Sequence, residues 1–232
     1  MHISTIYMRM TLWSSLLIAS SLSIVFEAQQ VLQDAASSLA DVQHELKIAE
    51  IIPTVIDDFA PSLLLNVTWP SDEPAELGNT INPKLLQKMP SLQLFDPLTS
   101  SSPVPASDMQ YTVALTDPDA PSRDDPEWSE ICHWIATNIH LTESESPILQ
   151  KDLTEVMEWK PPGPPPKTGK HRYVFLAFAP ANGTTDELNL SKPSDRQHWG
   201  TGEERHGVRQ WADENGLVPV AANFIYSQNK KQ

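Results

Sequence analysis

The chain has 232 residues, of which 40% are hydrophobic, 21 are proline and 8 are glycine. This length predicts one domain, and prolines spread along the chain favour a loop-rich β protein over a helical bundle. The formal net charge of −14 excludes nucleic acids and anionic membranes as partners held by overall charge. The single cysteine, Cys132, excludes an intrachain disulfide and a zinc site made of several cysteines, and its neighbours indicate a buried, inert thiol.

Residues 1–28 have the pattern of a signal peptide. Arg9 precedes an apolar run from Leu12 to Phe26, which is too short to span a bilayer as a stable helix. Two cleavage sites compete, after Ser21-Leu22-Ser23 or after Phe26-Glu27-Ala28, and an uncleaved anchor is the alternative. We expect a protein that is secreted or held in the secretory lumen, with no transmembrane span in its mature form.

Three acceptor sequences for N-glycosylation agree with that route. The last two lie in a polar segment typical of a surface loop. The expected glycosylated residues are Asn66, Asn182 and Asn189.

Periodicity predicts a helix at residues 29–50, followed by the main domain at residues 51–232. Apolar residues recur at helical spacing from Val31 to Leu46, and Pro53 marks the end of the pattern. Five short apolar runs then indicate strands, separated by clusters of Pro, Ser, Asp and Asn. These runs are LLLNVTW (63–69), SLQLF (91–95), YTVALT (111–116), HWIATNI (133–139) and RYVFLAF (172–178). They predict a mainly β fold, an antiparallel sandwich.

The remaining segments are short. Residues 206–215 have helical character, and Gly216 is placed to end that helix before a strand or short helix at residues 218–228. Residues 100–107 (SSSPVPAS) indicate a flexible surface loop.

Polar residues follow two of the predicted strands at points that predict a shared pocket. YTVALTDPDAP runs from a strand into Asp117 and Asp119, and GPPPKTGKHRYVFLAF brings His171 and Arg172 to the start of another. Histidines with a pKa of about 6.5 can donate to a phosphate or carboxylate, and an aspartate can orient a histidine or receive a ligand ammonium. Asp117 is assigned this role. A turn role is assigned to Asp119, an ion-pair role to Arg172, and for His171 a satisfied core histidine is the alternative.

These segments resemble the phosphatidylethanolamine-binding protein family, in its fungal secreted branch. The residues that carry the resemblance are DPDAP (117–121), GKHRY (169–173), His133 and Asn138, and it extends over nearly all of residues 51–228. It implies a Greek-key β-sandwich with a few peripheral α-helices, and a cis peptide before Pro121. It also implies an anion pocket lined by Asp117, Pro121, His133, Gly163, Pro165, His171 and Tyr226. Ile131 and Cys132 replace a tryptophan and a second histidine that are common in the family, so one wall of the pocket should differ.

No motif of a catalytic nucleophile, a nucleotide loop or an H-E-x-x-H zinc site is present. His133, His171 and Asp117 match the ligand types of a metal triad, but the family pocket resembles an anion site, so we expect no metal and no other cofactor. His140, His198 and His206 are expected to be solvated.

Three functions remain open from the sequence. The first is binding of a small anion such as phosphate, phosphoethanolamine or a dicarboxylate. The second, implied by the resemblance to fungal relatives, is an accessory role in pathways to dimeric maleic anhydrides, where the protein would help a ketosteroid-isomerase-like enzyme to couple two anionic monomers. The third is inhibition of a serine carboxypeptidase by the protein surface. The sequence does not choose among them.

Overall fold

A computed structural model of the chain describes residues 27, 29–98, 109–141, 147–148 and 150–231. Apart from Glu27, the expected signal peptide lies outside these ranges, as does the loop expected at residues 100–107. The chain divides into two compact units, residues 1–38 and residues 39–232. Of the first unit, the structure describes the helical residues 27 and 29–38.

The predicted amphipathic helix is present. Helical structure covers residues 29–48, and a turn follows at residues 49–50. Within the second unit, Val42 and Leu46 of this helix are buried in a hydrophobic cluster. Among the described residues, no helix is both long enough and apolar enough to cross a membrane.

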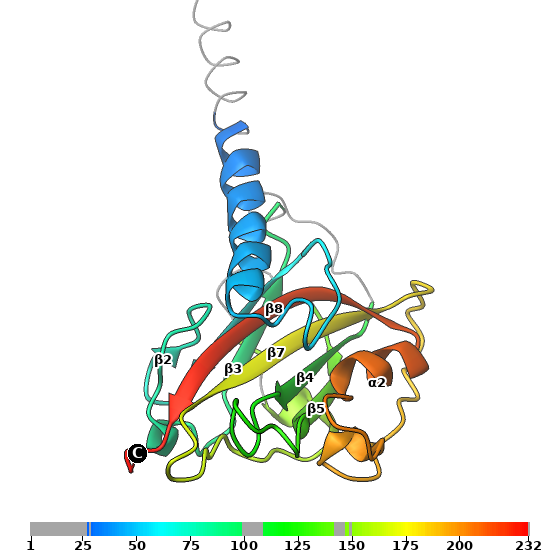
Figure 1. The fold of residues 1–232 in the computed structure, drawn as a ribbon. Coiled ribbons are helices and arrows are strands. Elements are labelled where there is room, and N and C mark those ends of the chain that lie inside the picture. The colour runs from blue at the N-terminus through cyan, green and yellow to red at the C-terminus, as the bar shows by residue number, and fades with distance from the viewer. Residues whose placement is uncertain (1–26, 28, 99–108, 142–146, 149, 232) are drawn as a thin grey trace, which may run out of the picture. The chain divides into compact units, whose positions relative to one another are not determined.

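The second unit is mainly β and holds two antiparallel sheets (Figure 1). The larger sheet has the order β6 (Thr154–Met157), β5 (Ile131–Ile139), β4 (Tyr111–Asp117), β7 (Lys170–Pro180), β8 (Leu217–Gln228). The smaller sheet has the order β2 (Glu73–Pro74), β1 (Leu64–Trp69), β3 (Ser91–Phe95). The prediction of a mainly β, antiparallel fold is confirmed, and Greek-key connectivity stays a prediction.

The helical elements of the domain are short. They are the 3₁₀ helices η1 (Pro83–Leu85), η2 (Gln150–Asp152) and η3 (His198–Gly200), and the α-helix α2 (Val208–Glu214). Helix α2 occupies the predicted segment, and Gly216 follows it at φ 64°, a backbone conformation that glycine adopts without strain.

All five predicted strands are present, and the segment at 218–228 is the strand β8. The sequence missed β2 and β6. Strand β2 has only two residues, and β6 is an edge strand in which only Met157 is buried, so neither carries the alternating apolar pattern that predicts a strand.

The core lies on both faces of the larger sheet. Consecutive residues of β7 point in opposite directions, as strand geometry requires. Phe175 and Ala177 pack with β1 and β3 in one cluster, and Val174 and Leu176 pack with α2 in the other. The two faces of β7 therefore bring the residues at its start into two different environments.

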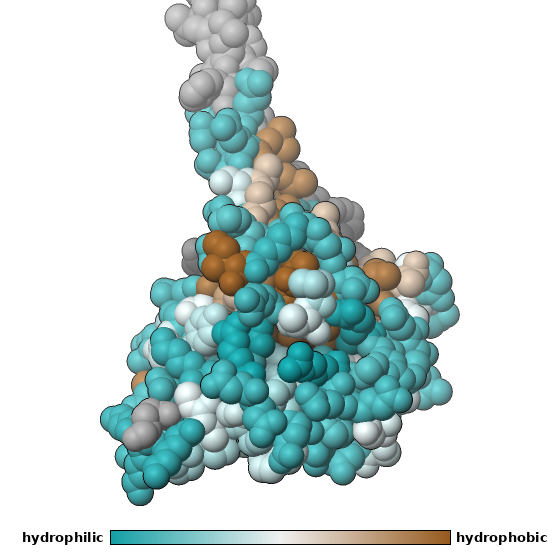
Figure 2. Space-filling view, in the orientation of Figure 1, coloured by the Kyte–Doolittle hydropathy of each residue, from teal (hydrophilic) through white to brown (hydrophobic). Residues whose placement is uncertain are grey.

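The surface in the same orientation is mostly hydrophilic, with hydrophobic residues in small, separate patches (Figure 2).

Candidate functional site

The aspartate that ends β4 and the histidine near the start of β7 form a buried pair. His171 Nδ1 donates a hydrogen bond to Asp117 Oδ2 over 2.9 Å, and the two side chains are only 1% and 4% exposed. The second carboxylate oxygen of Asp117 accepts the backbone N–H of Asp119 at 2.8 Å. The antiparallel pairing of β4 with β7 explains this contact, because it brings the end of one strand beside the start of the other.

The hydrogen bonds of His171 require both ring nitrogens to carry a proton. Nδ1 donates to the carboxylate of Asp117. Nε2 lies 2.9 Å from Thr168 Oγ1, whose own proton goes to the carbonyl of Pro165 at 2.8 Å. Because a hydroxyl has one proton to donate, Thr168 must accept from His171. Burial alone would lower the pKa of His171, but the hydrogen bond and charge of Asp117 outweigh it and raise this pKa above its ordinary value.

His133 reaches the same site through an irregularity in β5. The register pairs Leu115 with Trp134 and Thr116 with Cys132, which leaves His133 without a partner on β4. Its ring packs edge-to-face on Tyr173, with centroids 5.3 Å apart, and its Nδ1 donates to the carbonyl of Lys160 at 2.8 Å.

His133 is uncharged in this setting. Burial lowers its pKa to about 4, although the charge of Asp117 acts in the opposite direction. With the ring proton on Nδ1, Nε2 is a hydrogen-bond acceptor in the neutral ring. The two histidines therefore differ: the hydrogen bonds of His171 and the charge of Asp117 favour its cationic form, whereas burial favours the neutral form of His133.

Tyr173 joins these groups and was missed by the sequence reasoning. Its hydroxyl accepts the backbone N–H of Gly163 at 3.2 Å, and burial together with the nearby charge of Asp117 raises the pKa of Tyr173. Its ring stacks on that of His171, with centroids 6.3 Å apart. Strand alternation was the available signal, since a residue two positions after His171 lies on the same face.

The structure brings most of the predicted pocket residues together. The backbone of Pro121 lies close enough to His171 to help raise its pKa, and the expected cis peptide between Ala120 and Pro121 is present. Gly163 and Pro165 contribute through the backbone atoms described above. Tyr226 is the exception. It pairs with Arg172 across β7 and β8 and packs on the α2 side of the sheet, whereas His171 pairs with Ser227.

The turn role predicted for Asp119 is wrong. Its carboxylate binds the guanidinium of Arg172, with a shortest distance of 2.6 Å, and also accepts the backbone N–H of Arg172 at 2.8 Å. The predicted ion-pair role of Arg172 is confirmed. The side-chain turn belongs to Asp117, because it is Asp117 that accepts the N–H two residues onward.

The other predictions for single residues have mixed outcomes. Cys132 is fully buried, and burial raises its pKa to about 12, so its thiol is inert as expected. His140 and His206 are exposed, but His198 is only partly exposed and its Nε2 bonds to the carbonyl of Glu127 at 2.7 Å. Within the described residues, no group of three or more His, Cys, Asp and Glu side chains is arranged to hold a metal ion.

The family model named "Phosphatidylethanolamine-binding protein" matches residues 71–225. The chain belongs to this family. Carboxypeptidase Y inhibitor of Saccharomyces cerevisiae is 35% identical over 201 residues, which cover 78% of this chain and 91% of the inhibitor. A second yeast relative, the uncharacterized protein YLR179C, is 31% identical over 189 residues, with 80% of this chain and 92% of the relative covered.

Solved structures agree with the family assignment. A crystal structure of carboxypeptidase Y inhibitor complexed with its cognate proteinase matches with a TM-score of 0.73 and 36% identity, covering 83% of this chain and 97% of that chain. The phosphatidylethanolamine-binding protein from Plasmodium vivax matches with a TM-score of 0.59 and 18% identity, covering 82% and 98%, which shows the shared fold alone.

Proposed function

We propose that this family member binds a small singly charged anion, a phosphate monoester or a carboxylate, beside His133 and His171. The observation that carries the proposal is the difference in charge between the two histidines. A cationic imidazolium attracts an anion, and a neutral imidazole offers an acceptor to any proton that the anion still carries.

The hydrogen bonds that His171 and His133 already make decide which protonation state of the ligand fits best. Both protons of His171 already have partners inside the protein, so this residue acts through its charge unless Thr168 moves aside. Nε2 of neutral His133 is an acceptor, which suits the P–OH of a monoprotonated phosphate better than a fully ionised one. Affinity for phosphate is therefore expected to rise as the pH falls from about 7.5 toward about 6, because the phosphate takes up a second proton over this range and becomes singly charged.

Titration calorimetry with phosphate, phosphoethanolamine and maleate at both pH values tests this proposal. His133→Gln should weaken binding by about 1–3 kcal/mol, the scale of a hydrogen bond to a charged group. His140→Gln, on an exposed histidine, is the matched control and should leave affinity unchanged. Equal affinities in wild type and His133→Gln would refute the proposal. Preference for maleate would favour the dicarboxylate role expected for a partner of a ketosteroid-isomerase-like enzyme.

Inhibition of a serine carboxypeptidase is the second candidate. It is favoured by the 35% identity to the yeast inhibitor over 91% of that protein and by the match to its complex with the proteinase. The expected result is that the protein lowers the turnover of a peptide substrate by carboxypeptidase Y at micromolar concentration. His133→Gln should inhibit equally well if the surface makes the contact. Absence of inhibition at a hundredfold molar excess would exclude this function for that protease.

Export with N-glycosylation is also proposed. All three acceptor asparagines, Asn66, Asn182 and Asn189, are exposed, as glycosylation requires. Expression in a eukaryotic host should give a shortened N-terminus and a faster-migrating band after amidase treatment. An intact Met1 without glycan would contradict export.

A further inference from the structure

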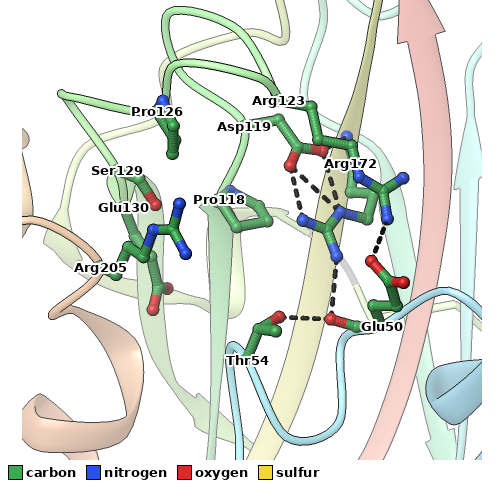
Figure 3. Close-up of a pocket in the computed structure, with 10 residues that line it drawn as sticks. All are labelled: Glu50, Thr54, Pro118, Asp119, Arg123, Pro126, Ser129, Glu130, Arg172 and Arg205. Carbon is green, nitrogen blue, oxygen red and sulfur yellow. Dashed lines mark hydrogen bonds and ion pairs between the residues drawn. The ribbon is translucent and has the colours of Figure 1, made fainter.

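A cavity of about 140 Å³ lies among residues of the DPDAP segment, β7, the end of the N-terminal helical segment and the chain that leads into β5 (Figure 3). Its wall includes Asp119 and Arg172, which follow Asp117 and His171 by two residues and by one. Arg172 shares the sheet face of Tyr226 and α2, so the cavity and the His133 site use opposite faces of β7.

Most of the charged groups around this cavity already have partners. Asp119 pairs with Arg172 at 2.6 Å, and Arg123 pairs with Glu50 at 2.7 Å. Arg172 also donates from Nη1 to the carbonyls of Ala49 and Glu50. These two pairs leave little net charge to attract a ligand.

Glu130 is different, because it lines the cavity as a buried acid without a counter-ion. Among the described residues it forms no ion pair, and it is only 2% exposed. Its Oε2 accepts from the hydroxyl of Thr116 at 2.8 Å and from the N–H of Val208 at 3.4 Å. Burial raises the pKa of Glu130 to about 7. A buried carboxyl in this situation holds either a proton or a cationic partner.

Arg205 supplies the opposite sign at the same cavity. Its side chain is 68% exposed, and its ion pair runs from Nε to the exposed Glu204 at 3.3 Å. Its backbone N–H donates to the carbonyl of Ser129 at 2.6 Å, which fixes it beside the residue that precedes Glu130. Figure 3 shows the Arg205 guanidinium on the same side of the cavity as Glu130, across Pro118 from the Asp119–Arg172 pair.

We propose that this cavity is a second ligand site, for a small zwitterion whose ammonium pairs with Glu130 and whose acidic group pairs with Arg205. A simple anion would approach the carboxyl of Glu130, and a simple cation would approach the guanidinium of Arg205, so a ligand of one sign satisfies only one of them. This site is separate from the anion site proposed above.

The test compares β-alanine with propionate and n-propylamine, which are of similar size and carry one charge each. Binding is followed by NMR titration of the isotope-labelled protein. β-Alanine is expected to bind at least about tenfold more tightly than either analogue. Glu130→Gln and Arg205→Gln should each abolish this preference. Lys192→Gln, which removes an exposed partner of Glu158, is the control and should retain it.

The pH dependence gives an independent reading. The ammonium needs ionised Glu130, so affinity for β-alanine should rise about tenfold from pH 6 to pH 8 as a group with a pKa of about 7 loses its proton. The pH dependence should be absent in Glu130→Gln, which controls for the other charged groups around Glu130. These are Arg172, Arg209, Asp119, Glu50, Arg123 and Arg205.

Each outcome decides the proposal. Equal binding of the three probes, or no binding at all, overturns it. If Glu130→Gln does not fold, the exposed Arg205→Gln variant decides, and unchanged β-alanine affinity in that variant also overturns it. His133→Gln should bind β-alanine as wild type does, so failure of the anion proposal and failure of this one are distinguishable.

Discussion

The two faces of the larger sheet differ in whether their buried charged side chains have partners. On one face, Asp117 and His171 partner each other, and Thr168 completes the hydrogen bonds of His171. On the other face, Asp119 and Arg172 are equally well paired, but Glu130 beside them has no counter-ion among the described residues. Because consecutive residues of a strand point in opposite directions, the two-residue step His171–Arg172 serves both faces at once. A short motif can thus place one buried pair on each face of the same sheet.

The largest effect should come from breaking the pair on the second face. Arg172→Met leaves Asp119 buried, at 1% side-chain exposure, without its cation. We expect a loss of about 3–5 kcal/mol in the free energy of unfolding, the range for removing one partner of a buried ion pair. Urea denaturation measures it. Arg123→Met is the matched control, since its pair with Glu50 is 39% and 69% exposed and should contribute about 1 kcal/mol at most. Equal losses in the two variants would contradict the contrast between buried and exposed pairs.

Glu130 should make the protein less stable as the pH rises. Its pKa is raised from 4.5 to about 7, so the folded state binds the proton more tightly than the unfolded state does. The stability contributed by Glu130 therefore falls between about pH 4.5 and 7, by roughly 3 kcal/mol at one pKa unit per 1.36 kcal/mol. Relative to wild type, Glu130→Gln should gain roughly 3 kcal/mol in the free energy of unfolding as the pH rises across that range, measured by urea denaturation. A constant difference between the variant and wild type would show that Glu130 does not cause a pH-dependent loss.

His133 should act in the opposite direction over nearly the same range. Its pKa is lowered from 6.5 to about 4, so the unfolded state binds the proton more tightly. Stability from this residue is present above pH 6.5 and is lost as the pH falls toward 4, again by roughly 3 kcal/mol. Because Glu130 and His133 oppose each other, their contributions nearly cancel between pH 4.5 and 6.5. His133→Gln should reveal the fall due to Glu130, and a variant with the wild-type profile would contradict this account.

Part of this arrangement was predictable from the sequence, because it depends on strand ends. Asp117 and His171 each lie beside a clear apolar strand, so their meeting follows from an antiparallel sheet. His133 was identified by the family resemblance. The direction of its side chain depends on the register shift opposite Leu115 and Thr116, which hydrophobic periodicity does not predict.

Other features depend on contacts between distant parts of the chain. Glu130 is held by Thr116 and by Val208, which lies 78 residues away, so no local pattern marks it. Tyr226 was predicted for the pocket, yet its pairing with Arg172 places it on the opposite face. A shift of one residue in the strand pairing reverses which face a side chain occupies, and local sequence does not set that register.

The smallest effect should come from removing the hydrogen bond between Thr168 and His171. Thr168→Ala removes the acceptor of His171 Nε2 and should lower the free energy of unfolding by about 1 kcal/mol, the contribution of one hydrogen bond. It should also lower the pKa of His171, because the charged form loses a partner. A raised pKa gives stability that is present below pH 6.5 and is lost as the pH rises through the folded value, so in the variant this loss should be smaller and should end at lower pH.

NMR titration of the His171 ring and urea denaturation check both parts of that prediction. Thr201→Ala is the control. It also removes one threonine hydrogen bond, from Oγ1 to the carbonyl of His198 at 2.8 Å, but this bond does not involve His171. The control should leave the His171 titration unchanged. If Thr168→Ala also leaves it unchanged, then Thr168 does not hold the charged imidazole, and the hydrogen bond and charge of Asp117 alone keep His171 protonated.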